Sequence, residues 1–238
     1  MKSPLLVGPL VEFDVVASTQ DEAVRLLKSG SSAGILFARH QTAGRGRFHR
    51  VWESCETGSL TVSFVFELEV GHNQPWLYGM AIACAVAMAF DLRLQWPNDL
   101  VWNGKKIGGI LTEVTTIESG QRFAIIGLGL NLNGSGVPSE FRDRASSIEE
   151  SCDRQYTPSE ALSLILQLIE KVPHPDSWHV LKELWAKLDT SPGKLYRCPE
   201  GRVCIAKEIG EQGELIGDFG GQIEVVYAAD AFIGGSAL

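Results

Sequence analysis

Residues 41–52 read QTAGRGRFHRVW, a loop in which glycines alternate with arginines. Gly44 and Gly46 let the backbone turn its N–H groups toward a ligand, and the arginines can fork onto phosphate or carboxylate oxygens. The apolar run at 34–38 predicts a buried strand before the loop, which places the loop where sheets usually hold ligands. The stretch therefore predicts an anion-binding loop, with a solvated surface turn or a short nucleic-acid contact as alternatives.

The chain has 238 residues, and 21 Lys+Arg against 29 Asp+Glu give it a net charge of −8. This length suits one large domain, or a larger and a smaller one, with a core that needs no disulfides. The acidic balance argues against a general nucleic-acid binder, because such binding depends on neutralising phosphates. The arginine loop is a local exception to this balance.

Cysteine usage and apolar runs indicate the compartment. The five cysteines contain no Cys-x-x-Cys pair, and an odd number favours free thiols in a reducing environment. The N-terminus has no small-residue cleavage pattern, and the longest apolar stretch, 80–90, is too short to cross a bilayer. We therefore expect a cytoplasmic protein without a membrane segment.

The first helix is expected to start close to the arginine loop. Residues 11–17 predict a strand, and after Ser18 and Thr19 the apolar residues Ala23, Leu26 and Leu27 continue at helical spacing until residues 28–30 end the helix. Thr19 and Glu22 have the spacing of a capping box, so capping is one explanation for Ser18 and Thr19. A helix start also offers free N–H groups and a positive dipole end to a ligand. Both explanations stay open.

Residues 95–113, QWPNDLVWNGKKIGGILTE, form the second informative stretch. The Asn-Gly pair between apolar segments is a strong hairpin signal and predicts antiparallel strands at 100–102 and 106–113. Lys106 begins the second strand near two adjacent glycines, whose missing side chains leave room for a ligand or another backbone. Lys106 is a candidate site residue, although a solvated hairpin lysine would have the same spacing.

The rest of the pattern alternates strands with helices. Strands are predicted at 59–68 and 122–128, and the glycines of 127–133 again bare the backbone. Helices are predicted at 75–90, 157–169 and 176–188, the second with a capping box and Pro at its first position. A break at 190–193 divides a domain of residues 1–190 from a small, glycine-split β-barrel at 191–238.

Taken together, the loop at 41–52, the hairpin at 95–113 and the run at 127–133 resemble the biotin protein ligases, in order and in separation. The resemblance covers essentially the whole chain, and Trp-Pro-Asn-Asp followed by Lys106 and Gly-Gly-Ile-Leu makes it specific. It implies an α+β fold, with a mixed β-sheet flanked by helices and a small SH3-like barrel at the C-terminus. It also implies an ATP-dependent enzyme that activates biotin as biotinoyl-5′-AMP and transfers it to a carrier-protein lysine.

The resemblance implies a role for each matching residue. Biotin would contact Ser18, Thr19, Gln20, Gln41, Arg45, Gly46, Arg47 and Lys106. The nucleotide would contact Trp52, Asn98 and Asn131. Lys106, Arg45 and Arg47 would be the catalytic cations, since joining a carboxylate to ATP brings anions together and develops charge on the α-phosphate. Mg²⁺ is expected with ATP, and no acidic cluster identifies protein ligands for it.

Four positions depart from the family pattern, one of them near Thr61, where the family can have an aromatic residue. Gln20 stands where the family usually has asparagine, His49 where it has glycine, and Gln95 where it has lysine. His49 matters most, because a side chain at this position is expected to stiffen the loop.

The resemblance also implies partners. The expected acceptor is a biotin carboxyl carrier protein, from acetyl-CoA carboxylase or another carboxylase. A lipoate or other acyl-protein ligase of the same fold, and a biotin-binding protein without turnover, are the alternatives. Only 17 residues precede Ser18, too few for a helix-turn-helix domain, so DNA binding is not expected. The resemblance leaves open a homodimer paired through sheet edges.

Overall fold

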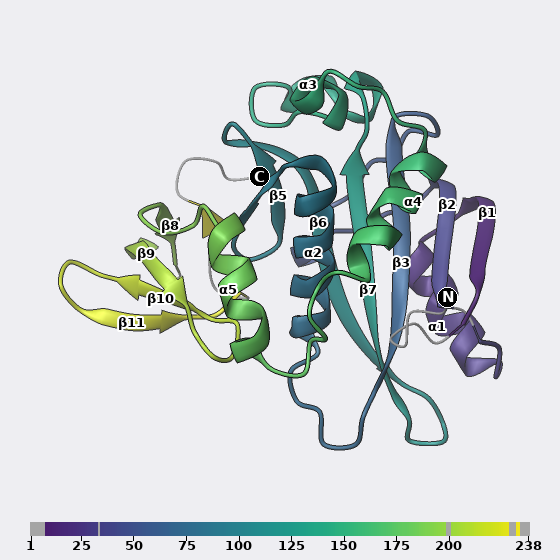
Figure 1. Ribbon diagram of the computed structural model, residues 1–238, viewed down its shortest axis with the longest axis horizontal. Coiled ribbons are helices and arrows are strands. Elements are labelled where there is room, and N and C mark those ends of the chain that lie inside the picture. The colour runs from purple at the N-terminus through teal and green to yellow at the C-terminus, as the bar shows by residue number, and fades with distance from the viewer. Residues whose placement is uncertain (1–7, 33, 199–200, 229–231, 234–238) are drawn as a thin grey trace.

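The computed structural model describes residues 8–32, 34–198, 201–228 and 232–233. A seven-stranded sheet with helices on both faces forms the larger part, and a five-stranded sheet lies at one end (Figure 1). The strand order of the large sheet is β1-β2-β3-β7-β6-β5-β4. Strand β1 runs parallel to β2, and the other neighbours are antiparallel. The predicted mixed sheet flanked by helices is confirmed.

The bounds of the elements follow the predicted pattern closely. The large sheet contains β1 (Leu10–Val16), β2 (Ile35–Gln41), β3 (Ser59–Leu68), β4 (Arg93–Gln95), β5 (Asp99–Trp102), β6 (Lys105–Thr116) and β7 (Arg122–Asn131). The helices are α1 (Thr19–Lys28), α2 (Trp76–Phe90), α3 (Ile148–Cys152), α4 (Pro158–Ile169) and α5 (Trp178–Leu188). The small sheet contains β8 (Leu195–Arg197), β9 (Val203–Ile209), β10 (Leu215–Asp218), β11 (Ile223–Val226) and β12 (Phe232–Ile233).

Helices cover the large sheet because each central strand is apolar on both faces. On one face, α1 packs Ala23 and Leu27 into a small cluster with Leu36, Val65 and Phe123. On the other face, α2, α4 and α5 pack into the main core, and α2 and α4 lie across the sheet in Figure 1. Helix α2 is buried on nearly all sides, which explains its run of alanines and apolar residues.

The predicted hairpin of β5 and β6 is confirmed. Asn103 and Gly104 both have positive φ, 48° and 76°, as a tight two-residue turn between twisted strands requires. The pairing register shifts between Leu100 and Val101, so Leu100 faces Gly108 while Val101 faces Lys106. This bulge lies directly beside Lys106.

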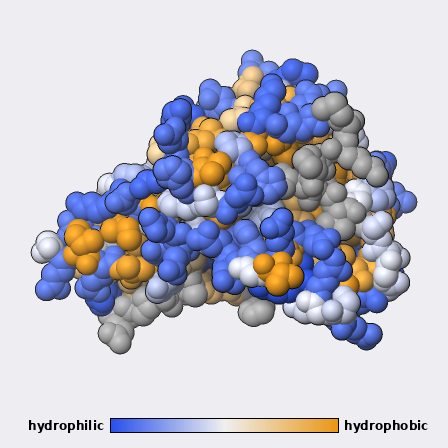
Figure 2. Space-filling view, turned by 60° about the horizontal axis from the view of Figure 1, so that its bottom comes forward, coloured by the Kyte–Doolittle hydropathy of each residue, from blue (hydrophilic) through white to orange (hydrophobic). Residues whose placement is uncertain are grey.

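The small sheet packs its inner face on the main core. Tyr196 is fully buried; its hydroxyl donates to the carbonyl of Trp96 at 2.9 Å, and the two rings meet edge to face. The outer face carries several exposed apolar side chains, and Figure 2 shows an apolar patch on the side where this sheet lies. Its exposed apolar residues are Leu195, Val203, Ile205, Ile223, Val225 and Tyr227.

Two expectations about local structure had different outcomes. The capping box at the start of α4 is present, with Thr157 and Glu160 bonded reciprocally and Pro158 at the first helical position. The short strand β4 was not predicted, because three residues show no periodicity.

Among the described helices, none combines the length and apolarity needed to cross a membrane.

Candidate functional site

One cavity of about 450 Å³ collects the residues that the sequence singled out. Its lining includes Ser18, Thr19, Gln20, Gln41, Arg45, Gly46, Arg47, Trp52, Asn98, Lys106 and Asn131. They come from the start of α1, the loop after β2, the β5–β6 hairpin and the end of β7. The tertiary structure therefore brings four distant segments together, and Lys106 faces the same cavity as Arg45 and Arg47. What each residue binds stays a prediction.

The start of α1 is tied to the loop through Thr19. Ser18 is the N-cap residue and its side chain makes no capping bond. The Thr19 backbone N–H and hydroxyl both donate to Gln41 Oε1, at 2.8 and 3.1 Å, and the hydroxyl lies 2.7 Å from Ser63 Oγ. The capping box predicted for Thr19 and Glu22 is therefore wrong, because the helix begins at Thr19 itself and its hydroxyl is used beside the cavity.

An ion cluster lies inside the cavity. The Lys106 Nζ atom lies 2.7 Å from Asp99 Oδ1, and the Asp99 side chain is only 11% exposed. Burial lowers the pKa of Arg47; the attraction of Asp99 opposes this shift, and repulsion by Arg50 adds to it. We call Arg47, Lys106 and Asp99 the inner cluster. Two cations against one carboxylate leave a positive surplus that favours an anionic ligand.

Arg47 is oriented by neutral partners from two parts of the chain. Its guanidinium donates to Asn98 Oδ1 at 3.4 Å, and it also donates to the carbonyl of Ala228, just after β11. Asn98 is held in turn by donating from Nδ2 to the Ile110 carbonyl at 2.8 Å. Among the ion pairs of the described residues, none joins a carboxylate to this guanidinium.

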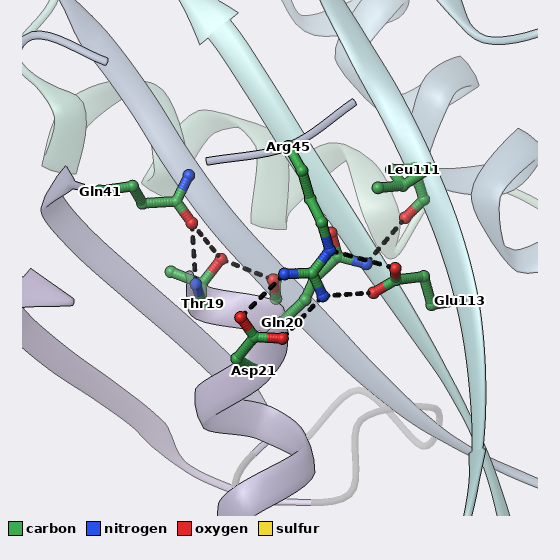
Figure 3. A network of polar contacts seen from close by, with 8 residues as sticks. Thr19, Gln20, Asp21, Gln41, Arg45, Leu111 and Glu113 are labelled. Carbon is green, nitrogen blue, oxygen red and sulfur yellow. Dashed lines mark hydrogen bonds and ion pairs between the residues drawn. The ribbon is translucent and has the colours of Figure 1, made fainter. Parts of the chain in front are cut away.

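A second ion cluster lies at the rim, and Figure 3 shows it. Arg45 spans two carboxylates: NH1 donates to Asp21 Oδ2 at 2.8 Å, and Nε and NH2 donate to Glu113 at 3.3 and 3.0 Å. The NH2 atom also lies 2.8 Å from Asp21 Oδ1. The hydrogen bond to Asp21, with help from Glu113, raises the pKa of Arg45 further. We call Arg45, Asp21 and Glu113 the rim cluster.

Trp52 and Asn131 shape another part of the lining. The Trp52 indole lies against Gly129, where a Cβ atom would overlap the ring, so only glycine fits this position in β7. Asn131 is 5% exposed and donates from Nδ2 to the Ser146 carbonyl at 3.1 Å. Trp52 Nε1 is buried and has no hydrogen-bond partner among the described residues.

The sequence did not point to the segment 138–146, which also lines the cavity. The Lys106 backbone N–H donates to the Arg144 carbonyl at 2.9 Å, and the Lys106 carbonyl accepts from Ser146 at 2.8 Å. The Arg144 guanidinium stacks on the Phe141 ring at 4.7 Å, and its Nε atom is buried without a partner among the described residues. Both side chains line the cavity. The polar composition of residues 134–156 predicts a loop, with or without a short helix, and no local spacing marks site residues in it.

The departures from the family pattern have distinct surroundings. Gln95 is 6% exposed and accepts a hydrogen bond from Lys194 Nζ, so an ammonium reaches this position from another part of the chain. Burial lowers the pKa of Lys194, against the attraction of Asp189 and Asp99. Gln20 donates to the Leu111 carbonyl at 3.4 Å. The side chain of His49 lies outside the described part of the structure, so its predicted effect stays a prediction.

Neither the sequence nor the geometry identifies protein ligands for a metal. Within the described residues, no three His, Cys, Asp or Glu side chains gather closely enough to hold an ion. Asp99 is the one acidic residue in the inner cluster, and Lys106 already neutralises it. A cation that arrives with a nucleotide would depend mainly on phosphate and water ligands.

Comparison with known proteins gives a consistent result. The model of the biotin/lipoate A/B protein ligase family matches residues 12–131. The bifunctional ligase/repressor BirA of Bacillus subtilis is 30% identical over 98% of this chain and 77% of its own length. The biotin–acetyl-CoA-carboxylase ligase of Mycobacterium tuberculosis is 30% identical over 92% of this chain and 88% of its own length.

Solved structures agree with these relatives. The biotin protein ligase from Aquifex aeolicus, in complex with biotin and ATP, superposes with a TM-score of 0.74. It is 25% identical in sequence, and the superposition covers 94% of this chain and 97% of that one. The similarity therefore extends over both sheets.

Proposed function

Because the chain belongs to the biotin/lipoate A/B protein ligase family, we propose that it is a biotin protein ligase. It activates biotin with ATP as biotinoyl-5′-AMP and transfers the biotinoyl group to a lysine of a biotin carboxyl carrier protein. The carrier belongs to acetyl-CoA carboxylase or to another carboxylase, in keeping with the relatives' names.

The observation that carries this proposal is the charge of the inner cluster. Among the described residues that line the cavity, Arg47 and Lys106 accompany a single buried carboxylate, Asp99. A site that joins a carboxylic acid to ATP must hold two anions in contact, and it must stabilise charge that develops between them. A cavity with a surplus of fixed cations meets both needs.

The reaction follows from this arrangement in two steps. A carboxylate oxygen of biotin attacks the α-phosphorus of ATP, the bond to the β-phosphate breaks, and pyrophosphate leaves. The uncharged amine of a carrier lysine then attacks the biotinoyl carbonyl, and AMP leaves with the bonding electrons while the amide nitrogen loses a proton. Lys106 is proposed to contact both the carbonyl and the α-phosphate, and Arg47 to hold the phosphate.

Apart from Arg45, the remaining predicted residues keep their proposed places around the two substrates. Biotin is assigned to residues near the start of α1 and in or beside the loop: Ser18, Thr19, Gln20, Gln41 and Gly46. The nucleotide is assigned to Trp52, Asn98 and Asn131. Arg45 contributes through the loop, because its guanidinium is occupied by Asp21 and Glu113. Mg²⁺ is proposed to enter with ATP, held mainly by phosphates and water.

Biotin-dependent exchange of pyrophosphate into ATP tests the first step, and label transfer to a carrier-domain lysine tests the second. Exchange that requires lipoate or another acid in place of biotin would identify a different acyl-protein ligase. Calorimetric biotin binding without any exchange would identify a binding protein without turnover. Either result overturns the proposal.

The wider organisation is proposed as well. We assign residues 1–190 to the catalytic domain and 191–238 to a small C-terminal domain with the SH3-like barrel that the family resemblance implies. Strands β8 to β12 form a continuous antiparallel sheet that supports this assignment. A homodimer through a sheet edge, a cytoplasmic location and the absence of DNA binding stay predictions.

A further inference from the structure

The rim cluster ties together three segments that surround the cavity. Asp21 lies in the first turn of α1, Glu113 lies in β6, and Arg45 belongs to the loop at 41–52. Figure 3 shows the guanidinium between the two carboxylates. No other segment supplies a carboxylate to Arg45 among the ion pairs of the described residues.

The geometry occupies almost all the hydrogen-bonding capacity of Arg45. A guanidinium has five N–H donors, and bidentate pairing with a carboxylate uses two of them on one edge. Asp21 takes the NH1 and NH2 edge, and Glu113 takes the Nε and NH2 edge. The guanidinium has little left to offer an anionic ligand while both carboxylates remain, and the rim cluster carries a net negative charge.

The same contacts restrain the loop. Arg45 forms an isolated antiparallel bridge with Val51, in which Gly46 donates to the Arg50 carbonyl at 2.8 Å and Trp52 donates to the Gly44 carbonyl at 2.9 Å. The loop thus folds back on itself as a narrow ribbon. The rim cluster attaches one strand of that ribbon to α1 and β6, whereas Arg47, two residues further on, has its own partners in Asn98 and the Ala228 carbonyl.

We propose that Asp21 and Glu113 are positioning residues that hold Arg45 and keep the loop closed over the cavity. This inference rests on the proposed function for its consequence: the closed loop retains the acyl-adenylate and keeps water from hydrolysing it before a carrier lysine arrives. The two carboxylates act through the loop and do not touch the reacting atoms.

Hydrogen exchange of the loop amides tests the positioning role without any substrate. In Asp21→Asn and Glu113→Gln the peptide 41–52 should exchange about tenfold faster, because a charge-assisted bidentate pair is lost. Glu22→Gln is the matched control: it removes a neighbouring first-turn carboxylate that pairs with Arg25 at 2.7 Å. Exchange in the first two variants that equals the control would overturn the inference.

Retention of the adenylate tests the consequence. The enzyme is loaded with biotin and α-labelled ATP, and label is followed after a chase with unlabelled ATP. Glu113→Gln should form the adenylate at nearly the normal rate and lose it about tenfold faster. A slower formation with unchanged loss would contradict the inference. If the wild-type protein forms no adenylate, the proposed function fails while loop exchange still decides the positioning role.

A double-mutant cycle separates action through Arg45 from independent action. Arg45→Ala already releases the loop, so adding Glu113→Gln should not increase the adenylate loss any further. Effects that multiply would show that Glu113 acts on its own and would overturn the inference. Far-ultraviolet circular dichroism of each variant confirms that it is folded.

Discussion

Two ion clusters border the same cavity, and they differ in charge balance and in exposure. The inner cluster has two cations, Arg47 and Lys106, against Asp99, whose side chain is 11% exposed. The rim cluster has one cation, Arg45, against Asp21 and Glu113, which are 56% and 36% exposed. The inner cluster therefore has charge to spare for a ligand, and the rim cluster has none. Arg45 and Arg47, two residues apart in one motif, therefore differ in how much positive charge they leave for a ligand.

The clusters differ in the number and the exposure of their carboxylates, because the Arg45 and Lys106 side chains are similarly exposed, at 27% and 30%. Solvent-exposed ion pairs contribute little individually, and a network with bidentate geometry is the exception that can fix a conformation. Four predictions test this contrast, and they begin with the largest expected effect.

Removing the inner cation should be most damaging. Lys106→Ala is expected to lower biotin-dependent pyrophosphate exchange by about 10²–10³-fold, because the charge on the α-phosphate loses its partner in the transition state. Lys105→Ala is the matched control, since its ammonium donates to the Arg142 carbonyl outside the cavity. If Lys106→Ala and Lys105→Ala both retain the normal rate of pyrophosphate exchange, the proposed contrast between the two clusters is wrong.

Removing the inner carboxylate should affect stability. Asp99→Asn leaves the Lys106 ammonium without its counter-ion, and we expect the free energy of unfolding to fall by ~2 kcal/mol. The value is below that of a fully buried pair because the Lys106 side chain is 30% exposed. Denaturant unfolding measures it, with Asp14→Asn as control: that carboxylate is 93% exposed, and its loss should have no measurable effect. Equal effects would remove the distinction between buried and exposed pairs.

Trp52, at the C-terminal end of the loop, should respond to added side-chain volume at its neighbour rather than to a change of charge. Gly129→Ala forces the Trp52 indole away from β7, and we expect a loss of ~1–2 kcal/mol of unfolding free energy with weaker nucleotide binding. Calorimetry with ATP measures the binding. Gly134→Ala is the control, because the nearest atom to its added Cβ would be 3.9 Å away. Unchanged nucleotide affinity in Gly129→Ala would show that Trp52 does not contribute to that subsite.

A change in ionic strength is expected to have the smallest of the four effects, and it acts on the hydrogen exchange of the loop. Raising the ionic strength from about 0.05 to 0.5 M is expected to speed hydrogen exchange of the loop about twofold, because the rim pairs are partly exposed and are screened. In Glu113→Gln the same change should have less effect, since one pair is already absent. Exchange measured without ligand avoids the separate salt dependence of ATP binding. A wild-type loop that ignores salt would contradict an electrostatic restraint at the rim.

Local patterns predicted most of the fold because neighbours in sequence decide turns and amphipathic faces. The bounds of β3 match the prediction at both ends, and Asn103-Gly104 marked the hairpin because few other residues adopt positive φ in succession. The start of α1 was misjudged, since Ser18 and Thr19 both suit a cap and only contacts with Gln41 and Ser63 separate them.

The candidate site was predictable only where one segment carried an unusual combination of residues. Arg45, Arg47 and Lys106 stood out from their glycine-rich neighbours. The sequence showed Asp99 as part of the Trp-Pro-Asn-Asp motif but gave it no partner. No sequence pattern indicated Arg144. Partners of this kind come from segments distant in sequence, so no local spacing encodes them.

By itself the sequence determined which residue types carry the chemistry: glycines that bare a backbone, two loop arginines, and a lysine that follows a tight hairpin. Only the tertiary structure decided how the charges divide. It brought Asp21 and Glu113 to Arg45 and gave Lys106 a single buried carboxylate. The physical reason is that a charge acts according to the counter-ions and solvent around it, and chain folding sets both.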